Sequence, residues 1–393
     1  MRLLKLAFEH LDLFESERLS LDFFASDRVA ADRGITPLDA PIYSQNLLAF
    51  AGINATGKTT ALRLVHGALG ILMGKAISAD LSNLLFDLSA DLVIMHSIFF
   101  HEGSFYQLQT TFEIESTPDG TFNLDEWVIA EEELWQSARP LTKKTLSSFD
   151  LFSQHAKKER VRSELSKELL DYLPDNVSMV TTLTKDSRQY LSPSLFTDNM
   201  WLDLSEAAID NTVLQVFDDS IESCEHNPKF DWYELSFKSG ATSFYYRQSE
   251  DLGLVLSDGT VKGANLVHQA TLALQTGGYL LVDEIENHLN KQLVGVILDL
   301  FESNETNPHG AVLVFSTHYP ELLDFIKRKD DVYFFSRSRD HRINAALYSS
   351  IVKRIENKKS EVFLSNYVKG TAPRYTAIAA LRKNVAKLVD EDD

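Results

Sequence analysis

The segment GINATGKT at 52–59 contains residue types that bind phosphate groups. Gly52 and Gly57 permit tight backbone geometry, so that successive N–H groups can point at one anion. Lys58 adds a positive charge for the β- and γ-phosphates of a nucleotide, and the Thr59 hydroxyl can bind Mg²⁺. An apolar strand pattern precedes the segment and a helical pattern follows it, as a phosphate-binding loop requires. The residues expected to contact the nucleotide are Asn54, Ala55, Thr56, Gly57, Lys58, Thr59 and Thr60.

Two adjacent carboxylates follow a second apolar segment, YLLV at 279–282. The segment has the length and composition of a buried strand, and nothing in it requires two mutually repelling acids at its end. We expect Asp283 to hold Mg²⁺ and Glu284 to act as the general base that polarises an attacking water. The alternative interpretation is an ordinary transition from strand to loop with exposed acids.

A histidine ends the next apolar segment, VLVFST at 312–317. The carboxyl ends of parallel strands form the crevice in which open α/β sheets bind ligands. His318 is therefore expected to act in catalysis by contacting the γ-phosphate and sensing its loss. The alternative is a histidine in a surface loop.

The turn LSDGT at 256–260 precedes a predicted helix. The free N–H groups at the start of a helix, together with its positive end, favour an anion. We expect Ser257 and Gly259 to cap the γ-phosphate held by a second subunit, because this turn comes one helix before the two carboxylates. A plain helix cap is the simpler alternative, since Ser and Asp are common capping residues.

Strands and helices are predicted to alternate around these motifs. After residue 256 this alternation is typical of a parallel α/β sheet flanked by helices. The expected elements are strands at 46–51, 279–283, 311–316 and 331–336 and helices at 59–72, 262–276, 289–302 and 319–327.

Antiparallel strands are expected in the first third of the chain, where apolar and polar residues alternate. The pattern predicts strands at 2–9 and 18–24 and a hairpin at 94–115, and residues 25–45 are expected to form a loop-like insertion. Strands return later in the chain, at 230–238 and 242–248. Between the hairpin and the last two strands the character is helical, with helices expected at 142–173 and 201–225. The expected organisation is an N-terminal half of one head at 1–123, a helical insertion lobe at 124–228 and a C-terminal half of the head at 229–393.

Composition limits the classes of protein that the chain can belong to. Its 393 residues exceed the size at which a single hydrophobic core usually stops growing. A formal net charge of −19 opposes extensive wrapping of nucleic acid. The single cysteine, Cys224, excludes an intrachain disulfide and is typical of a reducing compartment. Because no apolar run approaches the roughly 20 residues of a membrane span, we expect a soluble, cytoplasmic protein with no membrane contact.

Taken together, the motifs resemble the RecF/SMC-type branch of ABC ATPases, and in particular the standalone AAA ATPases related to the overcoming-lysogenisation-defect (OLD) family of phage-defence proteins. The resemblance rests on LLKLAFEHLDLF, GINATGKT, LSDGT, LLVDEIENHLN, FSTHYPELLD and YVKGTAP. It implies an α/β fold: an ABC-type P-loop ATPase head with antiparallel strands, a parallel sheet flanked by helices, and an inserted helical lobe. It also implies ATP and Mg²⁺ as ligands, and a homodimer or higher homo-oligomer that closes head-to-tail around Mg-ATP. By the same resemblance, Glu286–Asn290 is a loop that touches the opposite subunit.

The sequence departs from the family pattern at two points. Asp258 replaces the first glycine of the LSGGQ-like signature. The glutamine of a Q-loop is not assigned, because the candidates Gln107 and Gln109 both lie in the predicted hairpin.

The resemblance implies a bacterial anti-phage role, in which the ATPase drives or controls an effector protein encoded nearby, a nuclease or a toxin. The alternative is a DNA-repair or DNA-end-binding ATPase, which would use basic residues near the carboxyl end. We favour a solvated surface for these residues, because few aromatic side chains lie among them for base stacking. They are Lys327, Arg328, Lys329, Arg337, Arg339, Arg342, Lys353, Arg354, Lys358, Lys359, Lys369, Arg374, Arg382 and Lys383.

Overall fold

The structure is a computed structural model of the chain. It describes residues 1–29, 33–89, 91–116, 122–137, 141–184, 188–192, 195–196, 210–227, 229–230, 232–240, 243–246, 249–252, 254–338, 340–352, 358–365, 367 and 375–390. Within these ranges, no helix combines the length and the apolar composition needed to cross a bilayer. The YVKGTAP segment after Tyr367 and the first part of the predicted helix at 201–225 lie outside them.

A five-stranded sheet carries the predicted motifs, in the order β13-β14-β5-β15-β16. The strands are β5 (Leu47–Ala51), β13 (Tyr279–Val282), β14 (Val312–Thr317), β15 (Val332–Arg337) and β16 (Ile343–Leu347). The first four are parallel, and β16 runs antiparallel to β15 at one edge. Because both faces of a parallel sheet are covered, the inner strands are almost continuously apolar. This confirms the four strands expected at 46–51, 279–283, 311–316 and 331–336.

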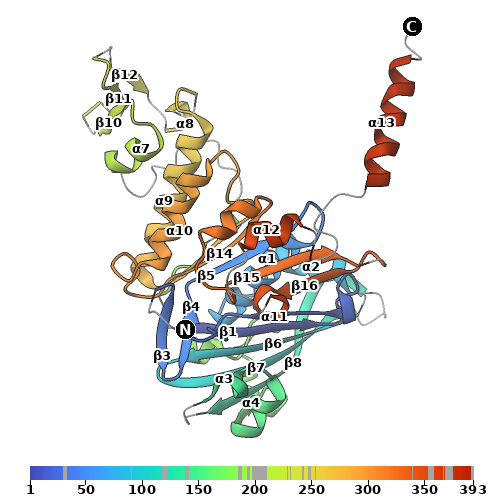
Figure 1. Ribbon diagram of the computed structural model, residues 1–393. Helices are drawn as coiled ribbons and strands as arrows, with labels where there is room; N and C mark the ends of the chain where they lie inside the picture. The colour runs from blue at the N-terminus through green and yellow to red at the C-terminus, as the bar shows by residue number, and fades with distance from the viewer. Residues whose placement is uncertain are drawn as a thin grey trace.

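A second sheet of six antiparallel strands lies below the first in Figure 1, in the order β2-β1-β6-β7-β8-β9. Its strands are β1 (Arg2–Glu9), β2 (Arg18–Asp22), β6 (Leu92–His101), β7 (Ser104–Ser116), β8 (Phe122–Ser137) and β9 (Lys157–Val161). The predicted strands at 2–9 and 18–24 and the predicted hairpin are confirmed.

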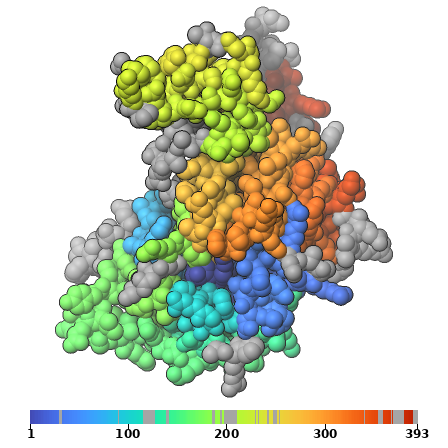
Figure 2. Space-filling model, turned by 90° about the vertical axis from the view of Figure 1, so that its left-hand side faces the viewer, coloured from blue at the N-terminus to red at the C-terminus, as the bar shows by residue number. Residues whose placement is uncertain are grey.

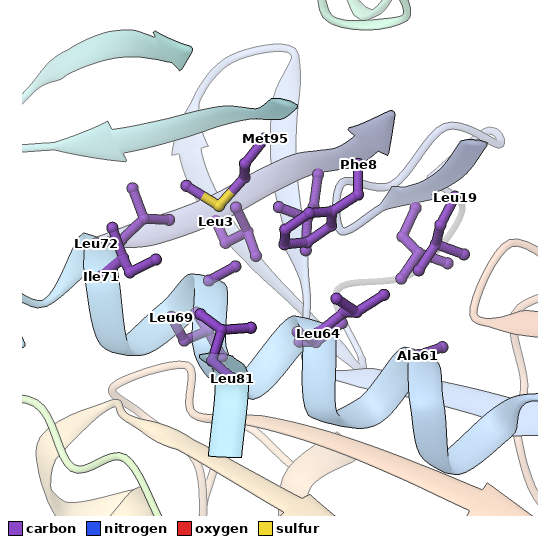
Figure 3. Packing of buried hydrophobic residues seen from close by; sticks show 14 of the residues in the cluster. Leu3, Phe8, Leu19, Ala61, Leu64, Leu69, Ile71, Leu72, Leu81 and Met95 are labelled. Atoms are coloured by element: carbon purple, nitrogen blue, oxygen red, sulfur yellow. The ribbon is translucent and has the colours of Figure 1, made fainter. Parts of the chain in front are cut away.

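Helix α1 (Lys58–Leu72) packs between the two sheets. Its apolar side chains face Leu3 and Phe8 of β1 and Met95 of β6 (Figure 3). Leu64 and Leu69 are fully buried there, and each such leucine stabilises the fold by roughly 1.5–3 kcal/mol. This shared core holds the start of α1 at the carboxyl end of β5.

Further helices cover the opposite face of the five-stranded sheet. They are α9 (Asp258–Thr276), α10 (Lys291–Glu302), the 3₁₀ turn η3 (Pro320–Asp324), α11 (Tyr348–Ile351) and α12 (Lys359–Leu364). The helix expected at 319–327 is wrong, because the chain makes only the short turn η3. The Asp324 carboxylate at its end accepts hydrogen bonds from the backbone and hydroxyl of Ser360, which ties the turn to α12.

The remaining elements lie at the ends and edges of these layers. They are η1 (Glu15–Glu17), β3 (Ile35–Asp39), β4 (Ile42–Gln45), α2 (Ala79–Leu88) and α13 (Tyr375–Asp390). The predicted loop-like insertion at 25–45 is thus partly wrong, because β3 and β4 pair antiparallel within it. Helix α13 stands apart from the rest of the chain in Figure 1.

The expectation of a helical lobe at 124–228 is wrong, because strands occupy much of this range. Strand β8 occupies its beginning and pairs with β7, and β9 pairs with β8. The expected helix at 142–173 is broken into α3 (Lys143–Leu146), α4 (Phe149–His155), β9, η2 (Arg162–Glu164) and α5 (Lys167–Leu170). The local helix propensity is overridden here, because the backbone N–H and C=O groups along the edge of β7 need hydrogen-bond partners. Short helix α6 (Thr181–Thr184) follows.

A small lobe stands on the amino end of α9, above the five-stranded sheet (Figure 1; yellow in Figure 2). It contains α7 (Asn211–Phe217), β10 (Ile221–Asn227), β11 (Trp232–Phe237), β12 (Phe244–Tyr246) and α8 (Ser249–Leu252). The strands form one antiparallel sheet in the order β10-β11-β12. The end of the expected helix at 201–225 is therefore strand β10, and the fold as a whole is mixed α/β.

Candidate functional site

Two positions of the glycine-rich loop between β5 and α1 leave no room for a side chain. Gly57 has a φ of +90°, and a Cβ there would lie 2.4 Å from Ile343. A Cβ on Gly52 would lie 2.6 Å from the carbonyl oxygen of Phe335. Ala55 also has a positive φ, of 61°. The two glycines of GINATGKT are therefore required because neighbouring residues pack closely on the loop at these positions. The sequence analysis expected tight backbone geometry at the same two residues.

Lys58 is the first residue of α1, and its side chain is buried. Its Nζ donates to the carbonyl oxygens of Gly52 at 2.9 Å and Ile53 at 3.1 Å. Nδ1 of His318 lies 3.1 Å from the same nitrogen. Burial lowers the pKa of Lys58 to about 8. Among the described residues no carboxylate forms an ion pair with Lys58, although the nearby carboxylates of Asp283, Glu284 and Glu286 partly offset the effect of burial on its pKa.

Thr59 and Asp283 meet where β5 and β13 end. The Thr59 hydroxyl donates to Oδ2 of Asp283 at 2.6 Å, and the hydroxyl of Ser316 donates to Oδ1. Ser316 Oγ also accepts the backbone N–H of Glu284 at 2.9 Å. Parallel pairing of β13 with β14 places Asp283 beside Ser316. Sequence reasoning missed Ser316, although a hydroxyl near the end of an apolar strand was a signal.

Glu284 and His318 form a second contact at the same edge of the sheet. Nε2 of His318 lies 3.0 Å from Oε1 of Glu284. On the other side of the ring, Nδ1 lies 3.1 Å from Lys58 Nζ. A protonated Lys58 can donate a hydrogen bond to Nδ1 when the ring proton is on Nε2. The Nε2–H group then donates a hydrogen bond to Glu284. The imidazole thus links the buried lysine to the half-exposed carboxylate.

Two charged residues that the sequence analysis did not assign to the site hold these loops in place. Oε1 of Glu286 accepts the backbone N–H of His318 at 2.6 Å. Nζ of Lys262, in α9, donates to the carbonyl oxygen of Glu284 at 3.2 Å. Both side chains are buried. They fix the backbone of the two residues expected to act in catalysis.

The glycine-rich loop opens onto a cavity of about 390 Å³. Its lining consists of Leu13, Asn54, Ala55, Thr56, Gly57, Lys58, Thr59, Thr60, Glu284, His318, Arg337 and Ile343. Nε of Arg337 donates to the carbonyl oxygen of Ala55 at 2.6 Å, which braces the outer part of the loop. All seven residues expected to contact a nucleotide line this cavity.

A second cavity of about 390 Å³ lies beside Thr59 and Asp283. Its other polar lining residues are Arg63, His66, Ser78, Asp80, Asn83 and Asp87. Because Thr59 lines both cavities, its hydroxyl lies at their junction.

Ser257 and Gly259 lie away from the cavity at the glycine-rich loop. Ser257 caps α9, and its Oγ accepts the backbone N–H of Thr260 at 3.1 Å. A Cβ on Gly259 would lie 2.6 Å from the carbonyl oxygen of His288, so this turn packs directly on the loop at 286–290. Neither residue is among the described residues that line the cavity. Within one chain, the turn therefore has the helix-cap geometry of the simpler alternative.

The two candidate Q-loop residues do not reach the cavity either. Gln107 and Gln109 both lie inside β7, where they pair with β6 and β8. The structure thus brings the seven loop residues together with Asp283, Glu284 and His318. It leaves Ser257, Gly259 and the two glutamines apart from them. Neither a comparison with protein-family models nor a search of curated proteins finds a match to this chain.

Proposed function

We propose that this protein is an ABC-type ATPase that binds and hydrolyses Mg-ATP, and that two copies close head-to-tail around the nucleotide. The observation that carries the proposal is the 2.6 Å contact between Thr59 Oγ1 and Asp283 Oδ2, next to the buried Lys58. A hydroxyl at the start of a helix beside a strand-end carboxylate is the donor set that P-loop NTPases offer to Mg²⁺.

The glycine-rich loop fits the phosphates of a nucleotide. Lys58 Nζ directly contacts carbonyl oxygens and an imidazole, so a bound phosphate would give the ammonium a direct ion pair. Gly57, the N-cap residue of helix α1, has no side chain to accept from the helix, which leaves the first N–H groups of α1 for an anion. When bound, Mg²⁺ would be held by Thr59 and Asp283 and would neutralise charge on the phosphates.

Glu284 is the general base in this proposal. About half of its side chain is exposed, and its Oε1 is oriented by the contact with His318. A carboxylate at the cavity wall can accept the proton of an attacking water. His318 contacts Lys58 through its other ring nitrogen. Loss of the γ-phosphate changes the charge next to Lys58, and His318 would transmit this change to Glu284.

The γ-phosphate contact in trans is the reason for a dimer. Ser257 and Gly259 pack against the 286–290 loop, so one continuous surface presents the capping turn together with the loop that follows the carboxylates. Nδ1 of His288 lies 3.6 Å from the carboxylate of Asp258, which adds an ion pair to this surface when the imidazole is protonated. The γ-phosphate bound in the glycine-rich loop of a second copy would lie against this surface.

The DNA-binding alternative loses support because several of its basic residues have partners within the chain. Arg328 pairs with Asp330 and Asp331, and Arg342 pairs with Glu17. Arg337 braces the glycine-rich loop, and Lys359 is buried with its Nζ on the carbonyl oxygen of Ile326. Arg339, Lys353, Arg354, Lys369 and Arg374 lie outside the described residues. Control of a nearby-encoded effector in anti-phage defence, carried by the family resemblance, is the biological role that we propose.

The Glu284→Gln variant tests the chemistry. Removal of the base should slow phosphate release by roughly 10²–10⁴-fold while ATP still binds. Light scattering after size exclusion in Mg-ATP should then show a stable dimer. Turnover at the normal rate would refute the base assignment.

The trans contact is tested in the same background by adding Ser257→Arg. Nucleotide affinity should be retained while the ATP-dependent dimer is lost. Ser148→Arg is the matched control, because Ser148 caps the unrelated helix α4 with the same side-chain contact. A dimer that persists in the Ser257→Arg variant would exclude the head-to-tail arrangement.

A further inference from the structure

The small sheet β10-β11-β12 has one covered face and one open face. Leu235 and Ile221 are fully buried against α7, α8 and the start of α9. Because side chains alternate along a strand, Trp232 and Glu234 point to the opposite side. Tyr245 pairs with Glu234 in the register of β11 and β12, and 56% of its surface is exposed.

An aromatic row crosses this open face. The rings of Phe230 and Trp232 stack with centroids 4.6 Å apart, and Tyr245 lies 5.2 Å from Trp232. Phe230 is also 53% exposed. Aromatic faces carry negative charge in their π-systems and attract cations. The Nζ of Lys229 already lies 5.1 Å from the centroid of the Phe230 ring. The row therefore offers apolar area, and Trp232 and Tyr245 offer cation-binding faces, to the same partner.

Two carboxylates face each other beside the row. Glu225 of β10 is the register partner of Glu234 of β11, on the same open face. Like charges directly opposite on a sheet are destabilising. Neither carboxylate forms an ion pair with any residue that the structure describes. Across 210–256, acidic residues outnumber Lys and Arg nine to three, so the whole lobe favours a cationic occupant.

Helix α13 has the complementary character. Its sequence contains three basic residues, Arg382, Lys383 and Lys387, against one acidic residue. Leu381 is 63% exposed and Val385 49% exposed, and every residue from 379 to 387 is exposed. Figure 1 shows α13 standing apart from the small lobe, so the helix does not cover this sheet face within its own chain.

We propose that α13 of one copy docks on the open face of β10-β11-β12 of a second copy. The cationic side chains of α13 would lie over the aromatic row and between Glu225 and Glu234, which relieves the repulsion between these carboxylates. Leu381 and Val385 would bury against the aromatic rings. This contact requires no nucleotide, so it is separate from the proposed ATP-held dimer and links copies beyond it.

Charge reversal tests the contact in the full-length protein without nucleotide. Lys383→Glu with Lys387→Glu should weaken self-association in sedimentation velocity by at least about tenfold, because like charges then meet at the interface. Glu225→Lys with Glu234→Lys should have the same effect. A chain carrying all four changes should recover association. Lys144→Glu with Lys157→Glu, at exposed positions of α3 and β9, is the matched control and should associate normally. Association that is insensitive to both reversals, or a wild-type protein that stays monomeric, would overturn the proposal.

Cross-linking locates the contact. Tyr245→Cys and Val385→Cys are prepared as separate proteins and mixed with a bifunctional maleimide in the absence of nucleotide. The native thiol will not interfere, because burial raises the pKa of Cys224 to about 11. A covalent dimer should form mainly in the mixture. Equal yields from each variant alone would show that α13 binds elsewhere.

Discussion

The hydroxyl of Thr59 donates a hydrogen bond of 2.6 Å to the carboxylate of Asp283, although the two residues are 224 positions apart in the chain. The contact exists because β13 ends at the same edge of the sheet as β5, with β14 between them. It places the start of α1 against the two strand-end acids.

Replacing Thr59 by Val removes the hydroxyl but keeps the shape of the side chain. Affinity for Mg-ATP should fall by roughly 10–100-fold, while affinity for ATP in the presence of a chelator should change little, because only the metal loses a ligand. Isothermal titration with and without Mg²⁺ measures both. The control is Thr271→Val, at an exposed position of α9. An equal loss under both conditions would mean that Thr59 does not hold the metal.

Ser316→Ala should impair the site without touching a ligand. The change removes a donor to Asp283 and leaves the N–H of Glu284 without its acceptor. An orphaned buried N–H costs about 1–3 kcal/mol, so chemical denaturation should show a loss of that size. Phosphate release should also slow, because both acids lose their orientation. Full activity with reduced stability would limit Ser316 to a structural role.

ATP affinity should depend on the protonation of Lys58. Burial lowers the pKa of Lys58 to about 8 in the nucleotide-free protein, so the amine becomes neutral as the pH rises above 8. Bound phosphates favour the ammonium, and the affinity should therefore be constant below the pKa and fall above it. Fluorescent-nucleotide titrations between pH 7 and 9.5 would follow this change. Lys58→Arg, which stays charged at these pH values, should show no such decline. A flat profile for the wild type would contradict the assignment.

The buried carboxylate of Glu132 should determine the stability of β8. It accepts hydrogen bonds from Thr110 and Ser178 and from the N–H of Met179, and it lies 3.5 Å from Arg162. Glu132→Ala leaves the buried Arg162 with the exposed carboxylate of Asp175, 3.7 Å away, as its one ionic partner among the described residues, and should cost about 3–5 kcal/mol. Glu132→Gln should cost less, because burial already raises the pKa of this carboxyl and Gln keeps most hydrogen bonds. Urea unfolding compares the two. Equal losses would show that the charge itself holds β8.

The six-stranded sheet shows where sequence patterns failed. The glutamates in EEELWQS at 131–137 favour a helix locally, and this stretch lies within the helical lobe that was expected at 124–228. In the structure these residues form β8, because its backbone completes the edge of β7 and Glu132 finds partners on distant segments. Serine residues inside the expected helix at 142–173 act as caps of new short helices instead. No pattern within this stretch indicates those contacts.

The amino-acid sequence by itself determined the glycine-rich loop, the parallel strands and the two acids and the histidine at their ends. These features depend on local backbone geometry and on short runs of apolar residues, and both are specified by residues that are neighbours in the chain. Only the tertiary structure decided that Ser316, Glu286 and Lys262 orient those groups, and that Ser257 lies outside its own cavity. Such contacts join residues far apart in the chain, and their energies arise only when the sheet order has brought the segments together.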